Sequence, residues 1–260
     1  MARIGIFDSG VGGLTVQRAI FERFPGLDTV YLGDTARLPY GTKSVDVVTR
    51  YSLRNARFLS TRGIDLLVVA CNTASALALP ALREALAIPV LGVVEPGVKA
   101  AARATRGDRI GVIGTQSTIS SGAYQQAIAR ARPGATVIAR ACPLFVPLAE
   151  EGWTNPDDEV VRLVARRYLA PFVEAGIDTL VLGCTHYPLL AGAIARELPG
   201  VVLVDSAAAI AAEVQALVGP IEPGRSAIHQ FFVTDAPERF LGVAERFLGR
   251  AVEGAEHVDV

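Results

Sequence analysis

Two cysteines, Cys71 and Cys184, occupy equivalent places in two nearly identical segments of the 260-residue chain. The segments span residues 63–73 and 176–186, and each reads Gly-Ile-Asp, a short apolar run and then the cysteine. Such runs are typical of buried strands, so each cysteine is expected where a strand ends and a helical pattern begins. Backbone N–H groups and the helix dipole at that point favour a thiolate. Two such thiols facing one cleft could act as acid and base on opposite faces of a substrate.

Polar residues also follow other predicted strands. Asp8 and Ser9 begin the glycine-rich turn Asp8-Ser9-Gly10-Val11-Gly12-Gly13, where Ser9 and backbone amides could hold a small carboxylate. A dinucleotide site is disfavoured, because its third glycine would fall at Thr15. The loop that carries Tyr40 and Gly41 follows the carboxyl end of a strand, where α/β folds place ligand contacts. Two further residues at such a corner, which could bind substrate or cap a helix, are Thr115 and Thr118.

Three residues are candidate acid–base helpers for the thiols: Asp8, Glu150 and His186. His186 stands two residues after Cys184, and a histidine beside a cysteine can poise its proton, although a lone histidine is often only a satisfied polar group. Glu150 ends an apolar segment, for which the alternative is a solvated helix end. The third cysteine, Cys142, lacks polar residues after it and is interpreted as structural.

Composition excludes several classes of function. The net charge of -1 gives no general attraction to nucleic acid or an anionic membrane. Metal binding is disfavoured, because the chain has no close cysteine pair and only 3 histidines. The only lysines, Lys43 and Lys99, are not in positions typical of a pyridoxal Schiff base. Three cysteines in a chain with no visible export signal suggest free thiols, and we expect a cytoplasmic protein.

Short apolar runs alternate with helical patterns along the chain, which favours a mostly parallel α/β fold. The predicted strands are Arg3–Phe7, Thr29–Leu32, Asp65–Ala70, Pro89–Val94, Arg109–Ile113, Thr136–Ala139, Asp178–Leu182, Val201–Val204 and His229–Val233. The predicted helices are Leu14–Phe24, Ser44–Arg62, Ser75–Leu86, Pro96–Ala104, Ser121–Ala131, Asp158–Ala175, Ala191–Leu198, Ala207–Leu217 and Pro237–Leu248.

The repeat extends beyond the cysteines. Arg3-Ile4-Gly5-Ile6 recurs as Arg109-Ile110-Gly111-Val112, and four strands repeat in the same order. A duplication of this size predicts two similar doubly wound, mostly parallel α/β domains related by a pseudo-twofold, with the active site in the cleft between them. We expect the first domain to contain residues 1–95 and 208–260, and the second to contain residues 96–207.

Six separated motifs resemble those of the glutamate racemases, cofactor-independent two-cysteine enzymes of the aspartate/glutamate racemase family. The motifs run from residue 8 to residue 188 and depart from the family pattern at no position. They are Asp8-Ser9-Gly10-Val11-Gly12-Gly13-Leu14-Thr15-Val16, Gly33-Asp34-Thr35, Pro39-Tyr40-Gly41, Ala70-Cys71-Asn72-Thr73-Ala74, Pro147-Leu148-Ala149-Glu150 and Gly183-Cys184-Thr185-His186-Tyr187-Pro188.

The resemblance implies an enzyme that racemises glutamate without a cofactor and supplies D-glutamate for peptidoglycan synthesis in the bacterial cell wall. Cys71 and Cys184 would be the two proton-transfer residues. Asp8, Glu150 and His186 would assist them. Glutamate would be bound by Asp8, Ser9, Tyr40, Gly41, Asn72, Thr73, Thr185 and His186. We expect glutamate as the small-molecule partner and a homodimer whose geometry the sequence does not define.

Three alternatives stay open at this stage. A related two-cysteine racemase could act on aspartate or a hydantoin by the same mechanism. Dithiol redox chemistry would need Cys71 and Cys184 close enough to bond, which a substrate between them forbids. A two-domain binding module of the periplasmic type would need an export signal, and it gives no reason for two equivalent cysteines.

Overall fold

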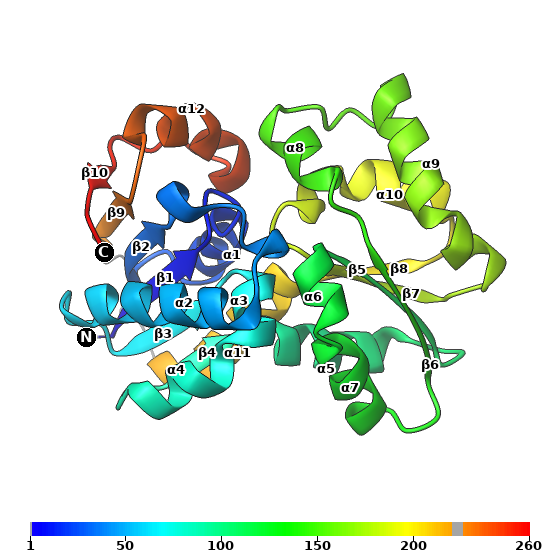
Figure 1. Ribbon diagram of the computed structural model, residues 1–260, viewed down its shortest axis with the longest axis horizontal. Coiled ribbons are helices and arrows are strands. Elements are labelled where there is room, and N and C mark those ends of the chain that lie inside the picture. Colours follow the sequence, from blue (N-terminus) through cyan, green and yellow to red (C-terminus); the bar gives the residue numbers. More distant parts are fainter. Residues whose placement is uncertain (1, 220–225) are drawn as a thin grey trace.

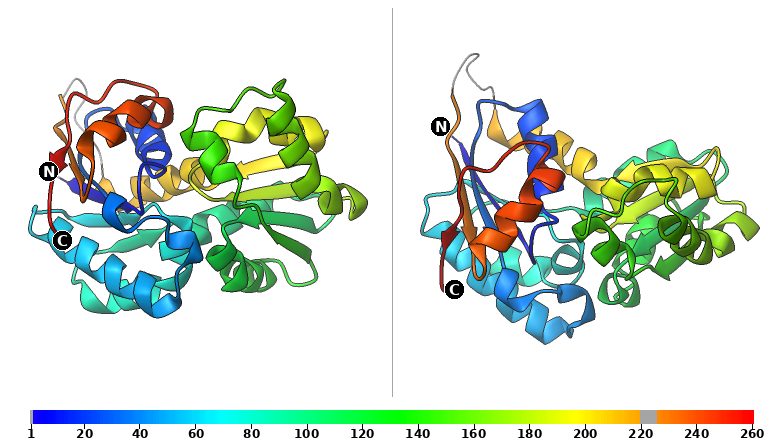
Figure 2. Two further views of the ribbon diagram at one scale, coloured as in Figure 1. Left: turned by 45° about the horizontal axis from the view of Figure 1, so that its top comes forward. Right: turned by 90° about the horizontal axis from the view of Figure 1, so that it is seen from above.

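The chain folds into two parallel β-sheets with helices on both faces of each, as seen in a computed structural model that describes residues 2–219 and 226–260 (Figure 1). The first sheet has the strand order β10-β9-β2-β1-β3-β4 and the second has the order β6-β5-β7-β8. Every recorded strand pairing is parallel. The predicted α/β architecture is therefore confirmed, and the two halves of the molecule lie side by side (Figure 2).

The first sheet is built from both ends of the chain. Its strands are β1 (Arg3–Asp8), β2 (Asp28–Gly33), β3 (Leu66–Val69), β4 (Val90–Gly92), β9 (His229–Val233) and β10 (Glu256–His257). The helical elements of this half are α1 (Leu14–Arg23), η1 (Thr35–Arg37), η2 (Tyr40–Thr42), α2 (Val45–Ser60), α3 (Asn72–Leu77), α4 (Leu79–Ala85) and α12 (Pro237–Leu248). The C-terminal part of the chain returns to this sheet, where β9 pairs with β2.

The second sheet repeats the central order of the first, with β5, β6, β7 and β8 in the places of β1, β2, β3 and β4. Its strands are β5 (Arg109–Gly114), β6 (Thr136–Ala141), β7 (Thr179–Gly183) and β8 (Val202–Asp205). The helical elements between β4 and β9 are α5 (Val94–Ala104), α6 (Gln116–Ser120), α7 (Ala123–Ala131), α8 (Phe145–Glu150), α9 (Glu159–Glu174), η3 (Tyr187–Leu190), α10 (Ala191–Glu197) and α11 (Ser206–Val218). The equivalence of the two cysteine-bearing strands, β3 and β7, follows from this shared order.

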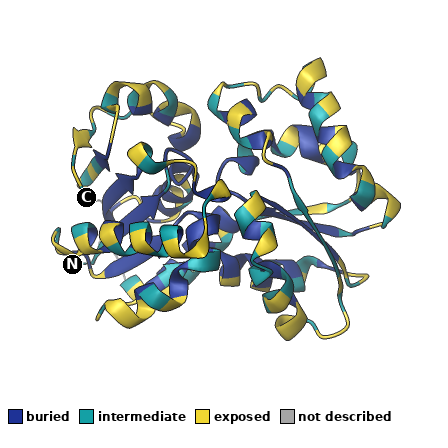
Figure 3. Cartoon of the chain, viewed as in Figure 1, coloured by how far each residue is buried: buried dark blue, intermediate teal, exposed yellow. Residues whose placement is uncertain are grey.

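Each sheet is buried on both faces, which explains why the strands read as continuous apolar runs. Helices α1, α11 and α12 cover one face of the first sheet, and α2 and α4 cover the other. Helices α5 and α7 pack on one face of the second sheet, and α9 and α10 pack on the other. Figure 3 shows buried strands between helices whose outer surfaces are exposed. Helix α11 packs on both α1 and α5 and so joins the two halves.

Several details differ from the sequence-based expectation. The short helices α6 and α8 and the 3₁₀ turns η1, η2 and η3 were not among the predicted elements. The single helix expected over Ser75–Leu86 is two helices, α3 and α4, separated at Ala78. Pro80 explains the break, since proline lacks an N–H and is tolerated in the first turn of a helix, where it lies in α4. The short strand β10 was not predicted, because two residues give no periodic pattern.

Among residues 2–219 and 226–260, no helix has the length and hydropathy needed to cross a membrane. The expected division into domains at residues 95/96 and 207/208 stays a prediction.

Candidate active site

A cavity of about 150 Å³ lies between the two halves, where strands from both sheets end. Most of the candidate residues line it, from both halves: Ser9, Tyr40, Gly41, Cys71, Asn72, Thr73, Thr115, Glu150, Cys184, Thr185 and His186. Five further lining residues were not predicted: Gly10, Leu38, Pro39, Val146 and Pro147. Two candidate residues, Asp8 and Thr118, do not line the cavity and lie behind its wall.

Cys71 follows β3 and is the N-cap of α3, where its Sγ accepts a hydrogen bond from Ala74 N at 3.5 Å. The thiol itself donates to Ser9 Oγ at 3.7 Å. Burial raises the pKa of Cys71 to about 12, with repulsion from the Asp8 carboxylate adding to the rise. The helix N-terminus and Ser9 act in the opposite direction but do not outweigh burial. The helix N-terminus thus favours the thiolate of Cys71 as expected, but burial has the larger effect on its pKa.

Cys184 follows β7 but does not cap an α-helix, because the next element of the chain is the 3₁₀ turn η3. Its partner is His186, whose Nδ1 lies 3.8 Å from Cys184 Sγ. On the other side of the ring, His186 Nε2 lies 3.0 Å from Glu150 Oε1. Cys184, His186 and Glu150 thus form a row, in which Glu150 orients the imidazole and the imidazole faces the Cys184 sulfur.

His186 carries a proton at neutral pH. Burial lowers its pKa, but hydrogen bonds with Cys184 and Glu150 and the charges of a Cys184 thiolate and of the Asp8 carboxylate outweigh burial and raise the pKa to about 10. The pKa of Glu150 is lowered, chiefly by its hydrogen bond to His186, against the opposing effect of burial. An imidazolium beside the Cys184 sulfur stabilises negative charge there. The two equivalent cysteines thus have different surroundings, a helix N-terminus and burial at Cys71 and a charged histidine at Cys184.

Residues 13–214 match the model of the Asp/Glu/Hydantoin racemase family. The chain belongs to this family. The glutamate racemase of Geobacter metallireducens is 58% identical over 254 residues, which cover 95% of this chain and 92% of that protein. The glutamate racemase of Aquifex aeolicus is 51% identical over 251 residues, or 96% of each chain. A crystal structure of glutamate racemase from Francisella tularensis in complex with D-glutamate has a TM-score of 0.92 and 37% identity, covering 99% of this chain and 97% of that one. The resemblance recognised in the motifs is confirmed.

In this racemase fold, Asp8 lies beneath the cavity and is 1% exposed. Its Oδ2 accepts a hydrogen bond from Gly10 N at 2.9 Å, whereas its Oδ1 has no hydrogen-bond partner within the described part of the chain. Burial raises the pKa of Asp8, partly offset by His186 and by the backbone N–H groups of Gly10 and Gly13. Asp8 therefore acts through its charge on both Cys71 and His186.

Thr118 belongs to a cluster of three hydroxyl groups that joins the halves. Its Oγ1 lies 3.0 Å from Thr73 Oγ1 and 2.9 Å from Thr115 Oγ1, and Thr73 and Thr115 are themselves 2.9 Å apart. Thr73 comes from the first half, and the other two come from the second. Thr115 also caps α6 by accepting from Thr118 N, so both suggested roles of this corner, capping and lining the cavity, occur together.

Asn72 has a supporting residue that the sequence did not reveal. Tyr124, from α7 in the other half, donates its hydroxyl hydrogen to Asn72 Oδ1 at 2.6 Å. This bond fixes the amide so that Nδ2 is its free end, and Nδ2 has no hydrogen-bond partner among the described residues. Tyr124 is fully buried within a helical pattern that reads as ordinary core, so no sequence signal marks it.

Tyr40 lines the cavity with its ring, while its hydroxyl is engaged elsewhere. That hydroxyl donates to Asp34 Oδ2 and accepts from Asn55 Nδ2, the latter at 3.0 Å. Burial and the Asp34 carboxylate raise the pKa of Tyr40 far above its usual value. The loop between β2 and α2 is therefore held by a buried polar network of Tyr40, Asp34 and Asn55.

The glycine-rich turn serves close packing between the halves. A Cβ at Gly12 would lie 2.3 Å from Thr185 Oγ1 and 2.4 Å from His186 Nδ1. The neighbouring Thr15 Oγ1 bonds to the Thr185 carbonyl at 3.0 Å. Gly12 thus allows the Cys184 corner to approach the turn, and the anion-binding role expected for this turn stays a prediction.

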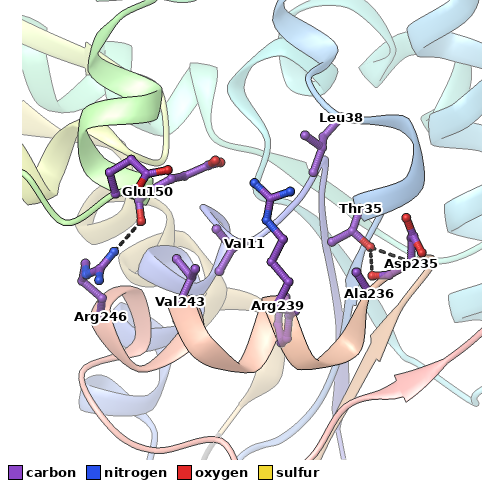
Figure 4. Close-up of a pocket in the computed structure, with 11 residues that line it drawn as sticks. Val11, Thr35, Leu38, Glu150, Asp235, Ala236, Arg239, Val243 and Arg246 are labelled. Carbon is purple, nitrogen blue, oxygen red and sulfur yellow. Dashed lines mark hydrogen bonds between the residues drawn. The ribbon is translucent and has the colours of Figure 1, made fainter.

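A second cavity, of about 340 Å³, adjoins the first and shares Leu38 and Glu150 with it (Figure 4). Helix α12 forms its floor, and Arg239 and Arg246 extend from that helix toward the shared residues. No group of three or more His, Cys, Asp or Glu side chains that could hold a metal ion occurs in residues 2–219 and 226–260.

Proposed function

We propose that the protein interconverts L- and D-glutamate without pyridoxal phosphate, flavin or a metal ion. The observation that carries the proposal is the meeting of Cys71 and Cys184, from equivalent corners of two repeated halves, in one small cavity. A volume of about 150 Å³ suits a small amino acid. Neither lysine of the chain lines the cavity, so no residue there could form a Schiff base.

Racemisation removes the Cα proton on one face of the amino acid and returns a proton on the other. Two opposed groups can do this without turning the substrate, provided that one is a thiolate and the other a thiol. Cys71, whose pKa burial raises to about 12, is suited to the role of the thiol, and Cys184 has the charged His186 beside it. After one turnover in the L-to-D direction the protonation states are exchanged and must be reset.

The carbanion that forms at Cα needs its carboxylate neutralised by hydrogen-bond donors. Asn72 is the strongest candidate donor, because it lines the cavity, its Nδ2 is buried without a hydrogen-bond partner among the described residues, and its Oδ1 is fixed by Tyr124. Backbone amides and other hydroxyl groups of the cavity wall add to it: Ser9, Thr73, Thr115 and Thr185. Glu150, His186 and Asp8 tune the thiols and are not themselves the proton carriers.

Glutamate is preferred over aspartate or a hydantoin as the substrate. Proteins named glutamate racemase are 46–58% identical to most of this chain, whereas an aspartate racemase homologue from Pyrococcus horikoshii shares 18% identity and supports the fold alone. The product, D-glutamate, would supply peptidoglycan synthesis in the cytoplasm, and we propose a homodimer as the assembled state.

The proposal is tested by following the optical activity of L-glutamate and, separately, D-glutamate by circular dichroism, with purified protein and no added cofactor. Both signals should decay to zero, and dialysis against EDTA should leave the rate unchanged. Cys71→Ala and Cys184→Ala are the matched inactive controls. Activity abolished by EDTA, restored only by pyridoxal phosphate, or faster with aspartate than with glutamate would contradict the proposal.

A further inference from the structure

Helix α12 belongs to the first half but contacts Glu150 and His186 of the second half. Its apolar side, including Phe240, Ala244 and Phe247, is buried in the core around α1. Its opposite side carries Arg246, which reaches Glu150 at the end of α8, and Arg239, which extends toward Leu38, as Figure 4 shows. The helix is thus anchored in one half and presents charged side chains to the other.

Arg246 contacts the end of α8 directly. Its Nη1 donates a hydrogen bond to the main-chain carbonyl of Glu150, the last residue of that helix. A carbonyl at a helix C-terminus lacks an intrahelical partner, and a guanidinium is a favourable cap for it. The guanidinium also packs on Gly152, where a Cβ would lie 2.7 Å from Arg246 Cζ. Gly152 has φ +80°, so the turn after α8 is shaped to receive this side chain.

Phe247, the next residue of α12, contacts His186, the hydrogen-bond partner of Glu150. The Phe247 ring stands at 76° to the imidazole of His186, with 5.1 Å between ring centroids. Phe247 is fully buried, which fixes its ring and the backbone next to Arg246. Two consecutive residues of α12 therefore hold Glu150 and His186, whose Oε1 and Nε2 lie 3.0 Å apart.

We propose that Arg246 is a positioning residue: by fixing the main chain of Glu150 from the opposite half, it keeps Glu150 and His186 aligned on the Cys184 sulfur. This inference rests on the proposed function only for its kinetic consequence. Other charged groups face the same pair, namely Asp8 beneath His186, and Glu151, Asp235 and Arg239 around the second cavity. Among the described residues, Arg239 lowers the pKa of Glu150 through its charge but has no hydrogen bond to α8.

The test compares Arg246→Ala, Arg246→Lys and, as a matched control, Arg239→Ala. Iodoacetamide alkylation of Cys184 and Cys71 is followed from pH 6 to 9 by mass spectrometry of the digested protein. In Arg246→Ala the rate at Cys184 near neutral pH should fall by about tenfold, the size expected for one lost charge-assisted hydrogen bond. Cys71 in the same molecule should keep its rate. Arg246→Lys should restore part of the loss, and Arg239→Ala should change Cys184 much less.

Racemisation is measured in parallel, with kcat expected to fall by about tenfold at nearly unchanged KM. Alkylation needs no substrate, so it decides the role of Arg246 even if glutamate is not racemised, whereas an inactive wild-type protein contradicts the proposed function alone. The inference is overturned if Arg246→Ala leaves Cys184 reactivity unchanged. Equal changes at both cysteines, or the same result from Arg239→Ala, would also overturn it, because they would indicate a general structural or charge effect.

Discussion

Cys71 and Cys184 occupy equivalent corners of the fold, yet the residues around them differ in charge. Burial and Asp8 raise the pKa of Cys71 to about 12, so loss of its proton is less favourable than for a free thiol. His186, with its pKa raised to about 10, keeps a positive charge 3.8 Å from Cys184 through the neutral range and loses it only above about pH 10. The surroundings of the two thiols are therefore asymmetric, with a buried helix N-terminus at Cys71 and a charged histidine at Cys184.

This asymmetry predicts that iodoacetamide alkylates Cys184 faster than Cys71 at pH 7. His186→Asn should remove most of the difference by slowing Cys184, since it deletes the imidazolium but retains a polar side chain of similar size. The rate at Cys71 should increase as pH rises, because its thiol becomes more deprotonated. Mass spectrometry of each cysteine peptide measures both rates in one sample. Equal alkylation rates of Cys71 and Cys184 at pH 7 in the wild-type protein would contradict the asymmetry between the two sites.

Tyr124 provides a second prediction at the scale of single residues. Tyr124→Phe deletes the hydroxyl that donates to Asn72 Oδ1 and leaves that buried oxygen unpaired, at a cost of about 1–3 kcal/mol in the free energy of unfolding. Because Asn72 is then free to rotate, kcat/KM for glutamate should fall by about tenfold.

The control for this change is Tyr168→Phe. It deletes the same atom from a tyrosine whose hydroxyl contacts Leu144 N, away from the cavity. Steady-state kinetics and thermal unfolding of both variants separate loss of stability from loss of function. Wild-type kcat/KM in Tyr124→Phe, or an equal loss in Tyr168→Phe, would show that Tyr124 does not position Asn72.

At the scale of elements, the turn between β1 and α1 must stay thin enough for the Cys184 corner to pack on it. Gly12→Ala should displace Thr185 and His186, because the new Cβ would lie 2.3–2.4 Å from them. We expect kcat to fall by at least about tenfold, as movement of a catalytic group by about 1 Å can cost far more. Gly242→Ala in α12 is the matched control, since nothing lies within 4 Å of its added Cβ. Full activity in Gly12→Ala would show that the corner tolerates the shift.

The elements that carry the cysteines could be predicted from the sequence because parallel strands leave clear local signals. An apolar run followed by Cys-Asn-Thr or Cys-Thr-His marks a corner at the carboxyl end of a strand, and the repeat shows that two such corners are equivalent. Tyr124 and Arg246 could not be found in this way. Each acts on a residue of the opposite half, and the distance along the chain, 52 residues to Asn72 and 96 residues to Glu150, leaves no periodic pattern.

Some of the chemistry also required the three-dimensional structure. The strand-end position of Cys71 correctly suggested a helix N-terminus, but the degree of burial that outweighs it depends on the packing of both halves. Likewise, the glycines of the first turn suggested anion binding, whereas Gly12 is needed because His186 packs against it from the other half. Local sequence predicts where a side chain stands, and the tertiary structure determines its protonation.

At the scale of the whole molecule, two halves with the same strand order face one cavity, so each cysteine is expected on its own side of the substrate Cα. Contacts that cross between the halves surround this cavity, among them the threonine cluster, Tyr124 with Asn72, and Arg246 with Glu150. These contacts hold the two corners at a fixed separation. The two repeats differ after the cysteine, Asn-Thr in the first and Thr-His in the second, so one thiol caps a helix and the other has a histidine partner.

The repeat therefore predicts that each cysteine serves one enantiomer, with Cys71 taking the proton from D-glutamate and Cys184 from L-glutamate, as family resemblance implies. Serine is a far weaker acid than cysteine, so Cys71→Ser and Cys184→Ser should each lower full racemisation by roughly 10²-fold or more. Each variant retains one thiol and should still start the reaction from one enantiomer. Exchange of the Cα hydrogen in deuterated water, followed by NMR from pure L- or D-glutamate, measures this directly. Cys71→Ser should exchange L-glutamate and Cys184→Ser should exchange D-glutamate. The same enantiomer preference in both variants, or wild-type racemisation in either, would show that the two corners do not act as one-sided bases.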